Sequence, residues 1–177
     1  MRRTTTLLVL ALAAGCATPS TAAHGLPAPA AASLLPDFEL ATVDGDRVRL
    51  SDLLGRKVVV LAFWDTWCEP CKTELPHLND IYQAHRKDGL AVLAVSMDDP
   101  STVVQVAPFV HEQGFAFPVL LDPSGTAAGL YDTHKSAPYT VVIGRDGTIA
   151  SEASGYEPGA EKPLEAEIVK LLAAKPR

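Results

Sequence analysis

Residues 58–76 read VVVLAFWDTWCEPCKTELP, and they contain the clearest structural pattern in the chain. Its first half is a continuous apolar run, which is typical of a strand buried on both faces of a sheet. Its second half places Cys68 and Cys71 where the hydrophobic period changes from strand to helix. A helix is expected from Pro70 to Lys87, because apolar residues recur there at steps of three and four. The sequence therefore predicts a buried strand that leads into a Cys-x-x-Cys helix start.

Strands and helices alternate on either side of this centre. A hairpin is expected over residues 38–50, where Asp44-Gly45 separates two apolar-rich runs. Further strands are expected at 90–95, 117–121, 139–143 and 148–152, and further helices at 101–113 and 164–172. This order implies an α/β fold, with a mixed sheet covered by helices on both faces.

The N-terminus has the layout of a bacterial export signal. Arg2 and Arg3 precede an apolar run over residues 7–14, and this run is shorter than the roughly 20 residues that span a membrane. Small residues then lead to Cys16, and the pattern resembles the lipidation site of bacterial lipoproteins, with Ala13 in place of the usual leucine. The resemblance implies that Cys16 is lipidated and anchors the protein to the membrane.

Three parts of the chain follow from this interpretation. Residues 1–15 are expected to be a signal peptide, 16–34 a lipid-anchored flexible linker, and 35–177 a single domain. The alternative is an ordinary signal that is cut later, after Ala23, which would discard Cys16. Both interpretations place the mature protein outside the cytoplasm, on the periplasmic side if the source has two membranes.

Composition and charge narrow the class of function. The chain has 177 residues, of which 47% are hydrophobic and 20% are charged, as in an ordinary globular domain. It carries 15 Lys and Arg against 21 Asp and Glu, a net charge of −6. This charge is unsuited to a phosphate-binding surface, so nucleic acid is not an expected partner.

The position of Cys68 at a helix start predicts its chemistry. Unpaired backbone N–H groups and the helix dipole stabilise an anion there, so the pKa of the Cys68 thiol is expected to be lowered. Cys71 lies one turn further in and is expected to be less exposed, which suits a resolving thiol. Redox catalysis is favoured over a structural disulfide, whose loop would be very short, and over zinc, which needs about four ligands. Haem attachment would need a histidine where the chain has Lys72.

The motif around the cysteines resembles the active site of thioredoxin-fold proteins. The matching residues are Phe63-Trp64-x-x-Trp67-Cys68-x-Pro70-Cys71-Lys72. The export signal, the N-terminal hairpin and the dipeptide Glu69-Pro70 are more specifically similar to the TlpA- and ResA-like thiol–disulfide oxidoreductases. The resemblance covers about residues 35–172. It implies a thioredoxin-like fold with a mixed central sheet flanked by helices, an N-terminal β-hairpin and a central insertion over 98–132.

The same resemblance implies an activity. Members of this group are membrane-anchored enzymes of thiol–disulfide exchange, and several are tied to cytochrome c maturation. The expected protein reduces protein disulfides through attack by Cys68 and resolution by Cys71, and a membrane thiol donor re-reduces it. Its redox-active group is the Cys68–Cys71 disulfide, and no other cofactor is expected.

This chain lacks the buried acid that thioredoxin has before its first cysteine, and Glu74 is expected to take over its role. Thioredoxin has a buried aspartate six residues before its first cysteine, where this chain has Ala62. ResA-like proteins carry a glutamate three residues after the second cysteine, and this chain has Glu74 there, an i, i+3 neighbour of Cys71. The resemblance implies that a partly buried Glu74 with a raised pKa moves a proton to or from Cys71. The alternative is an exposed first-turn acid that favours the helix dipole.

Residues that flank the cysteines are expected to contact the substrate. The resemblance implies a cis-proline at Pro138, with the backbone of Ala137 available to pair with an extended substrate. Trp67 is expected at the surface beside Cys68, and Glu69 is expected to be exposed, where its charge opposes the thiolate. The expected substrate-binding residues are Trp67, Glu69, Pro70, Ala137 and Pro138.

Two other functions compete with this one. A peroxiredoxin needs Pro-x-x-x-Thr-x-x-Cys, but Asp65 stands where the threonine is required, so this function is rejected. Asp65 itself is interpreted as a solvated loop residue. A copper-binding chaperone would use Cys68, Cys71 and His134, although such proteins space their cysteines by three residues. No other metal site is predicted. Titrating the reduced protein and its His134→Ala variant with Cu(I) distinguishes a copper chaperone from a thiol–disulfide oxidoreductase, because loss of tight binding in the variant would favour the chaperone.

Overall fold

The computed structural model describes residues 35–132 and 136–174. The strands in these ranges are β1 (Glu39–Thr42), β2 (Arg47–Arg49), β3 (Val58–Trp64), β4 (Leu90–Ser96), β5 (Val119–Leu121), β6 (Tyr139–Ile143) and β7 (Ile149–Ser154). The helices are α1 (Glu69–His85), α2 (Val106–Gln113), α3 (Ala128–Tyr131) and α4 (Glu161–Ala173), with the 3₁₀ turns η1 (Leu50–Asp52), η2 (Arg86–Asp88) and η3 (Val103–Gln105).

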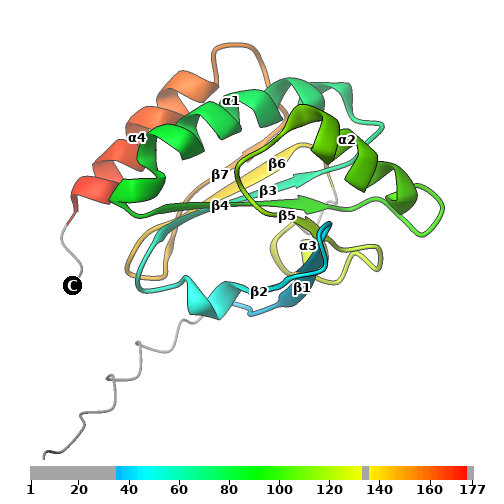
Figure 1. Ribbon diagram of the computed structural model, residues 1–177. Coiled ribbons are helices and arrows are strands. Elements are labelled where there is room, and N and C mark those ends of the chain that lie inside the picture. The colour runs from blue at the N-terminus through cyan, green and yellow to red at the C-terminus, as the bar shows by residue number, and fades with distance from the viewer. Residues whose placement is uncertain (1–34, 133–135, 175–177) are drawn as a thin grey trace, which may run out of the picture.

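The strands form one mixed sheet in the order β2-β1-β5-β4-β3-β6-β7 (Figure 1). β3, β4 and β5 are parallel to one another, whereas β1 and β6 join them in the antiparallel sense. β2 pairs with β1, β7 pairs with β6, and these two outer strands form the edges of the sheet. The expected thioredoxin-like sheet with its N-terminal hairpin is confirmed.

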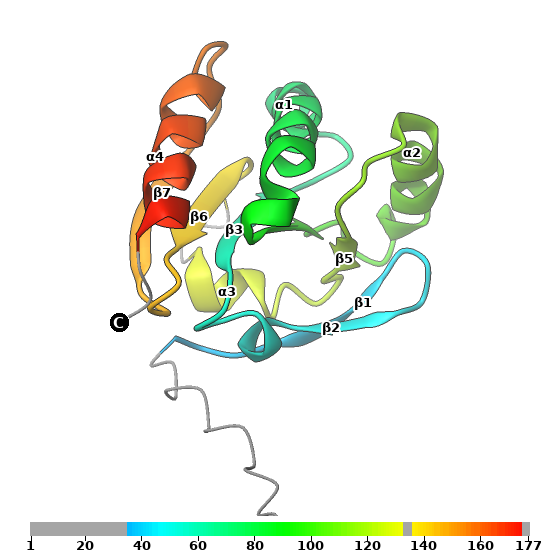
Figure 2. The same cartoon turned by 60° about the vertical axis from the view of Figure 1, so that its left-hand side comes forward.

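Helices cover the two faces of the sheet unequally. α1, α2 and α4 lie side by side over one face, while α3 lies on the other (Figure 2). Successive residues of β3 alternate between the two apolar layers: Val60 and Ala62 face the α1 layer, and Leu61 and Phe63 face the α3 layer. Because both faces of β3 are covered, this strand carries a continuous apolar run.

The expected helix over residues 101–113 is the main difference from the sequence prediction. The structure has the 3₁₀ turn η3 there, and α2 begins only at Val106. Pro108 fits this late start, because a proline is tolerated in the first turn of a helix but kinks or breaks its interior. The central insertion thus contains η3, α2, β5 and α3.

Several expectations concern residues outside the described ranges. The signal peptide, Cys16, the linker up to residue 34, and His134 all lie there. Across residues 35–132 and 136–174, no helix combines the length and apolar character needed to cross a membrane.

Candidate active site

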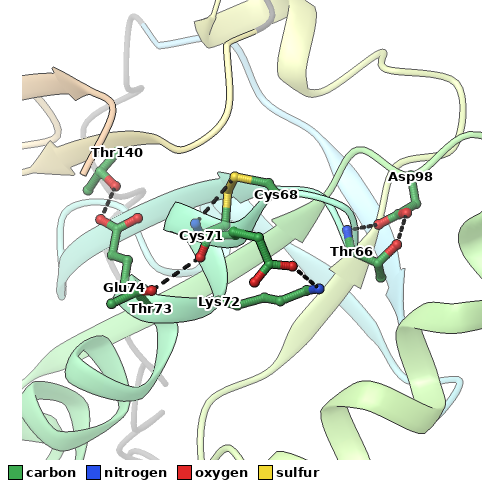
Figure 3. Close-up of a disulfide and its surroundings, with 9 residues drawn as sticks. Thr66, Cys68, Cys71, Lys72, Thr73, Glu74, Asp98 and Thr140 are labelled. Carbon is green, nitrogen blue, oxygen red and sulfur yellow. Dashed lines mark hydrogen bonds and ion pairs between the residues drawn. A yellow bond between two sulfur atoms is a disulfide. The ribbon is translucent and has the colours of Figure 1, made fainter. Parts of the chain in front are cut away.

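Cys68 and Cys71 form a disulfide at the start of α1 (Figure 3). Cys68 is the N-cap residue, and its Sγ accepts a hydrogen bond from the backbone N–H of Cys71 at 3.3 Å. Cys71 is fully buried, while Cys68 keeps 4% of its surface exposed. Cys68 is therefore the sulfur that a partner can approach, and it lies where helix N–H groups stabilise a thiolate.

Glu74 lies one turn further along α1 and is buried. Thr140 Oγ1 in β6 donates a hydrogen bond to Glu74 Oε1 at 2.9 Å. Burial raises the pKa of Glu74 from 4.5 to about 7, and the Thr140 hydrogen bond acts in the opposite direction. Thr140 is also the cross-strand partner of Ala62. Glu74 of α1 thus reaches the β3–β6 strand pair at the position of Ala62, where thioredoxin has its buried aspartate.

A cavity of about 300 Å³ opens beside Glu74. Its walls come from α1, β6, β7 and α4, and include His77, Thr140, Tyr156 and Leu164. The volume is enough for several water molecules, whose share of liquid volume is about 30 Å³ each. Glu74 is therefore buried against the protein yet has room beside it for proton exchange.

The residues expected to contact a substrate either flank Cys68 in the sequence or directly precede β6. Trp67 is 68% exposed, and the Ala137–Pro138 peptide bond is cis and directly precedes β6. Pro70 lies in the first turn of α1. Glu69 is exposed as expected, but it forms an ion pair with Lys72 at 2.9 Å. Lys72 therefore offsets part of the negative charge that Glu69 brings to the site.

Asp65 is not the solvated loop residue that the sequence suggested. It is only 5% exposed, and burial, followed by the nearby charges of Asp98 and Asp99, raises its pKa to about 6. The register explains the burial, because β3 and β4 are parallel with Trp64 opposite Ser96. The residues that follow the two strands therefore meet at one edge of the sheet.

Asp98 links the segments that follow β3 and β4, and it was not identified from the sequence. It is buried and accepts hydrogen bonds from Thr66 N at 2.9 Å, Thr66 Oγ1 at 2.5 Å and Ser96 Oγ at 3.0 Å. Figure 3 shows the Thr66–Asp98 pair on one side of the disulfide and the Glu74–Thr140 pair on the other. A usable sequence signal was present, since polar residues follow two adjacent buried strands that run in the same direction.

Metal binding gains no support from the part of the chain that the structure describes. It contains no group of three or more His, Cys, Asp or Glu side chains that could hold a metal ion. The chaperone hypothesis depends on His134, which lies outside that part.

The mixed sheet, the Cys-x-x-Cys disulfide at the start of α1 and the cis-proline before β6 define a thioredoxin-fold thiol–disulfide oxidoreductase. The sequence matches the AhpC/TSA family over residues 32–152. It is also 35% identical over 153 residues to the thiol–disulfide oxidoreductase ResA of Geobacillus kaustophilus, which covers 86% of each chain. The chain belongs to the AhpC/TSA family and to the ResA-like thiol–disulfide oxidoreductases.

Solved structures agree with this family. A protein assigned as the thiol:disulfide interchange protein DsbE of Chlorobium tepidum has a TM-score of 0.71 and 32% identity, over 78% of this chain and 94% of that one. The exposed lipoprotein thioredoxin Etrx1 of Streptococcus pneumoniae has a TM-score of 0.65 and 30% identity, over 77% of this chain and all of the other. The expected fold and enzyme class are confirmed.

Proposed function

We propose that this protein reduces protein disulfides outside the cytoplasm, with Cys68 as the attacking thiol and Cys71 as the resolving thiol. The observation that carries the proposal is the position of Cys68 Sγ at the N-cap of α1, where it accepts the Cys71 N–H. The same backbone donor is available to the thiolate in the reduced protein. Apocytochromes are one class of substrate that the family resemblance implies.

The first step forms a mixed disulfide. The Cys68 thiolate attacks one sulfur of the partner's disulfide, and the other partner sulfur leaves as a thiolate and takes up a proton. In the second step, the Cys71 thiolate attacks Cys68 Sγ. The partner's remaining sulfur leaves, and the partner has then gained two electrons. The Cys68–Cys71 disulfide of the structure is the product state of this reaction.

Glu74 serves the second step as a proton acceptor. Cys71 must lose its proton before it attacks, and it is buried away from solvent. Glu74 lies one helical turn away, and its pKa of about 7 makes it able to accept or release a proton near neutral pH. The cavity beside Glu74 supports the proposal, because it has room for water that can carry the proton onward.

The acidic surroundings favour the reducing direction. Asp65, Glu69 and Glu74 are all acidic and lie within six residues of Cys68 in sequence. Negative charge disfavours the thiolate and so favours the disulfide, which is the product of a reductase. We expect a reduction potential closer to the about −270 mV of thioredoxin than to the about −120 mV of a strong oxidant.

The location is part of the proposal. The chain is anchored through lipidated Cys16, with residues 16–34 as a tether, and a membrane thiol donor re-reduces the Cys68–Cys71 disulfide. The N-terminal pattern supports the anchor. The S. pneumoniae relative is itself described as an exposed lipoprotein, which also supports it.

A trapping experiment tests the order of the two cysteines. Cys71→Ser keeps the attacking thiol at the helix N-terminus but removes the resolving one, so mixed disulfides with partner proteins should accumulate. Cys68→Ser should accumulate none, because Cys71 is buried. The measurement is a non-reducing gel of each variant isolated from its own compartment. Equal adducts in both variants, or none in either, would contradict the assigned roles.

A further inference from the structure

A second cavity lies on the opposite side of the site from the Glu74 cavity. Its volume is about 310 Å³. Asp65 and Trp67 line it from the loop before Cys68, and Met97 and Asp99 line it from the segment after β4. The remaining wall comes from residues 123–125 and from Ala128. Trp67, which lines this cavity, directly precedes Cys68 in the chain, so the cavity belongs to the loop that leads into the attacking cysteine.

Three acids meet at this edge, and two of them have partners within the protein. Asp98 accepts hydrogen bonds from Thr66 and Ser96. Asp99 Oδ1 accepts from the Ser101 backbone N–H at 2.7 Å and from Ser101 Oγ at 2.5 Å. Hydrogen-bond donors within the protein therefore stabilise the negative charges of Asp98 and Asp99.

Asp65 differs from both. It is 95% buried and lines the cavity, yet none of the residues described by the structure gives its carboxylate a hydrogen bond or an ion pair. The charges that act on it are those of Asp98 and Asp99, both negative. A carboxylate that is largely withdrawn from water and lies near two other negative charges is costly to ionise, and a cation that reaches it through the open cavity lowers that cost. Asp65 therefore points to a ligand that carries positive charge.

We propose that this cavity binds a lysine or arginine side chain that lies beside the disulfide of the substrate protein. The inference rests on the proposed function, since the substrate carries the cation. Asp65 would take the charged head, and the apolar side chains of Trp67 and Met97 suit the aliphatic stem of such a residue. The exposed ring of Trp67 also offers a face to a cation.

The chemistry of the cavity favours an organic cation over a metal ion. Among the described residues no cluster of three or more acidic, His or Cys side chains is arranged to hold a metal. Asp98 and Asp99 already accept hydrogen bonds from neighbouring residues, which leaves Asp65 as the single carboxylate lining this cavity without such a bond. One carboxylate beside an apolar wall matches one ammonium or guanidinium group.

The test uses three synthetic disulfide peptides that differ only at the residue beside one cysteine, which is Lys, Gln or Glu. The reduced full-length protein is mixed with each peptide, and the second-order rate constant for a single round of peptide reduction is measured. The Lys peptide is expected to exceed the Gln peptide by about tenfold, the size of one charge-assisted hydrogen bond, and the Glu peptide is expected to be slowest.

Variants assign the selectivity to its residue. Asp65→Asn should bring the Lys-to-Gln ratio close to one, and Asp52→Asn, which makes the same charge change at an exposed position in η1, should keep the ratio of the wild type. If Asp65→Asn does not fold, the wild-type ratio is measured at low and high ionic strength, where charge pairing predicts a fall with salt.

The outcomes separate the two proposals. A wild type that reduces none of the peptides contradicts the proposed function. A wild type that reduces all three equally overturns the cation site alone. A preference for Lys that survives in Asp65→Asn also overturns it, because the selectivity would then come from another charge such as the exposed Glu69. A preference of the wild type for the Lys peptide that does not change with salt also overturns the cation site.

Discussion

The hydroxyl of Thr140 in β6 donates a hydrogen bond to the carboxylate of Glu74 in α1, at 2.9 Å (Figure 3). This bond ties the helix that carries the cysteines to the strand that follows Pro138. It stabilises the ionised form of Glu74, whereas burial stabilises the protonated form. The balance of the two places the pKa of Glu74 near neutrality, at about 7.

Thr140→Val tests that balance. Valine has nearly the shape of threonine but cannot donate a hydrogen bond, so burial acts unopposed and the pKa of Glu74 should rise above about 7. The carboxyl stretching band of Glu74, followed by infrared spectroscopy against pH with Glu74→Gln as the blank, measures it. A titration midpoint equal to that of the wild type would show that Thr140 has no effect on the charge of Glu74.

Glu74→Gln tests the role of the acid in proton transfer. The variant keeps the size of the side chain but cannot accept a proton, so attack by Cys71 should slow by about tenfold to a hundredfold, within or just below the range of general acid–base catalysis. The first attack by Cys68 should change less. Stopped-flow mixing of the reduced variant with a fluorescent disulfide separates the two steps. An unchanged titration of the Cys71 thiol in the variant would exclude Glu74 from the reaction.

Glu74 should also make the oxidised protein less stable as the pH rises. Its pKa in the folded state, about 7, lies above the ordinary value of 4.5, so the folded state holds the proton more tightly than the unfolded state. The resulting stabilisation is complete below about pH 4.5 and is lost as the pH rises through about 7, with a total of about 3 kcal/mol.

Urea unfolding of the oxidised protein between these pH values measures the effect. Glu74→Gln should flatten the upper part of the curve. Asp65, with its pKa raised to about 6, contributes a slope of the same sign at lower pH. A wild-type free energy of unfolding that rises between pH 6 and pH 8, relative to Glu74→Gln, would contradict the burial of Glu74 in its neutral form.

Asp98 is expected to be a structural residue. Asp98→Ala removes the acceptor of the Thr66 backbone N–H and of two hydroxyl groups at a buried position, so it should lower the free energy of unfolding by about 3 kcal/mol. The matched change Asp52→Ala, at an exposed site, should alter it by less than about 0.5 kcal/mol. Chemical denaturation of the oxidised proteins compares them. Equal stabilities of the two variants would remove Asp98 from this role.

Cys16 should decide where the protein resides. Cys16→Ser removes the expected lipid attachment site, and the protein should then leave the membrane fraction while its rate of disulfide exchange stays the same. Fractionation of cells followed by mass analysis of the mature N-terminus measures this. Wild-type protein that is entirely soluble and begins near Ala22 or His24 would show that an ordinary signal is cleaved there and that Cys16 is discarded.

Local patterns in the sequence were enough to predict the centre of the fold. The apolar run of β3 and the helical period of α1 are found where they were expected, because burial on both faces and helix amphipathicity leave direct periodic signals. The helix boundary near Val106 was harder to place. It depends on how one proline is accommodated in a first turn, which the period of the apolar residues does not reveal.

The reacting group could be predicted from local sequence alone, because two cysteines lie one helical turn apart and the first is at a helix start that stabilises a thiolate. The environment of the nearby acids, in contrast, depends on contacts between distant segments. Glu74 meets Thr140 across 66 positions of sequence, and Asp65 is buried beside Asp98 because two parallel strands end at the same edge. A pKa depends on which side chains cover a group and which donors reach it, and these contacts arise only when distant segments pack together.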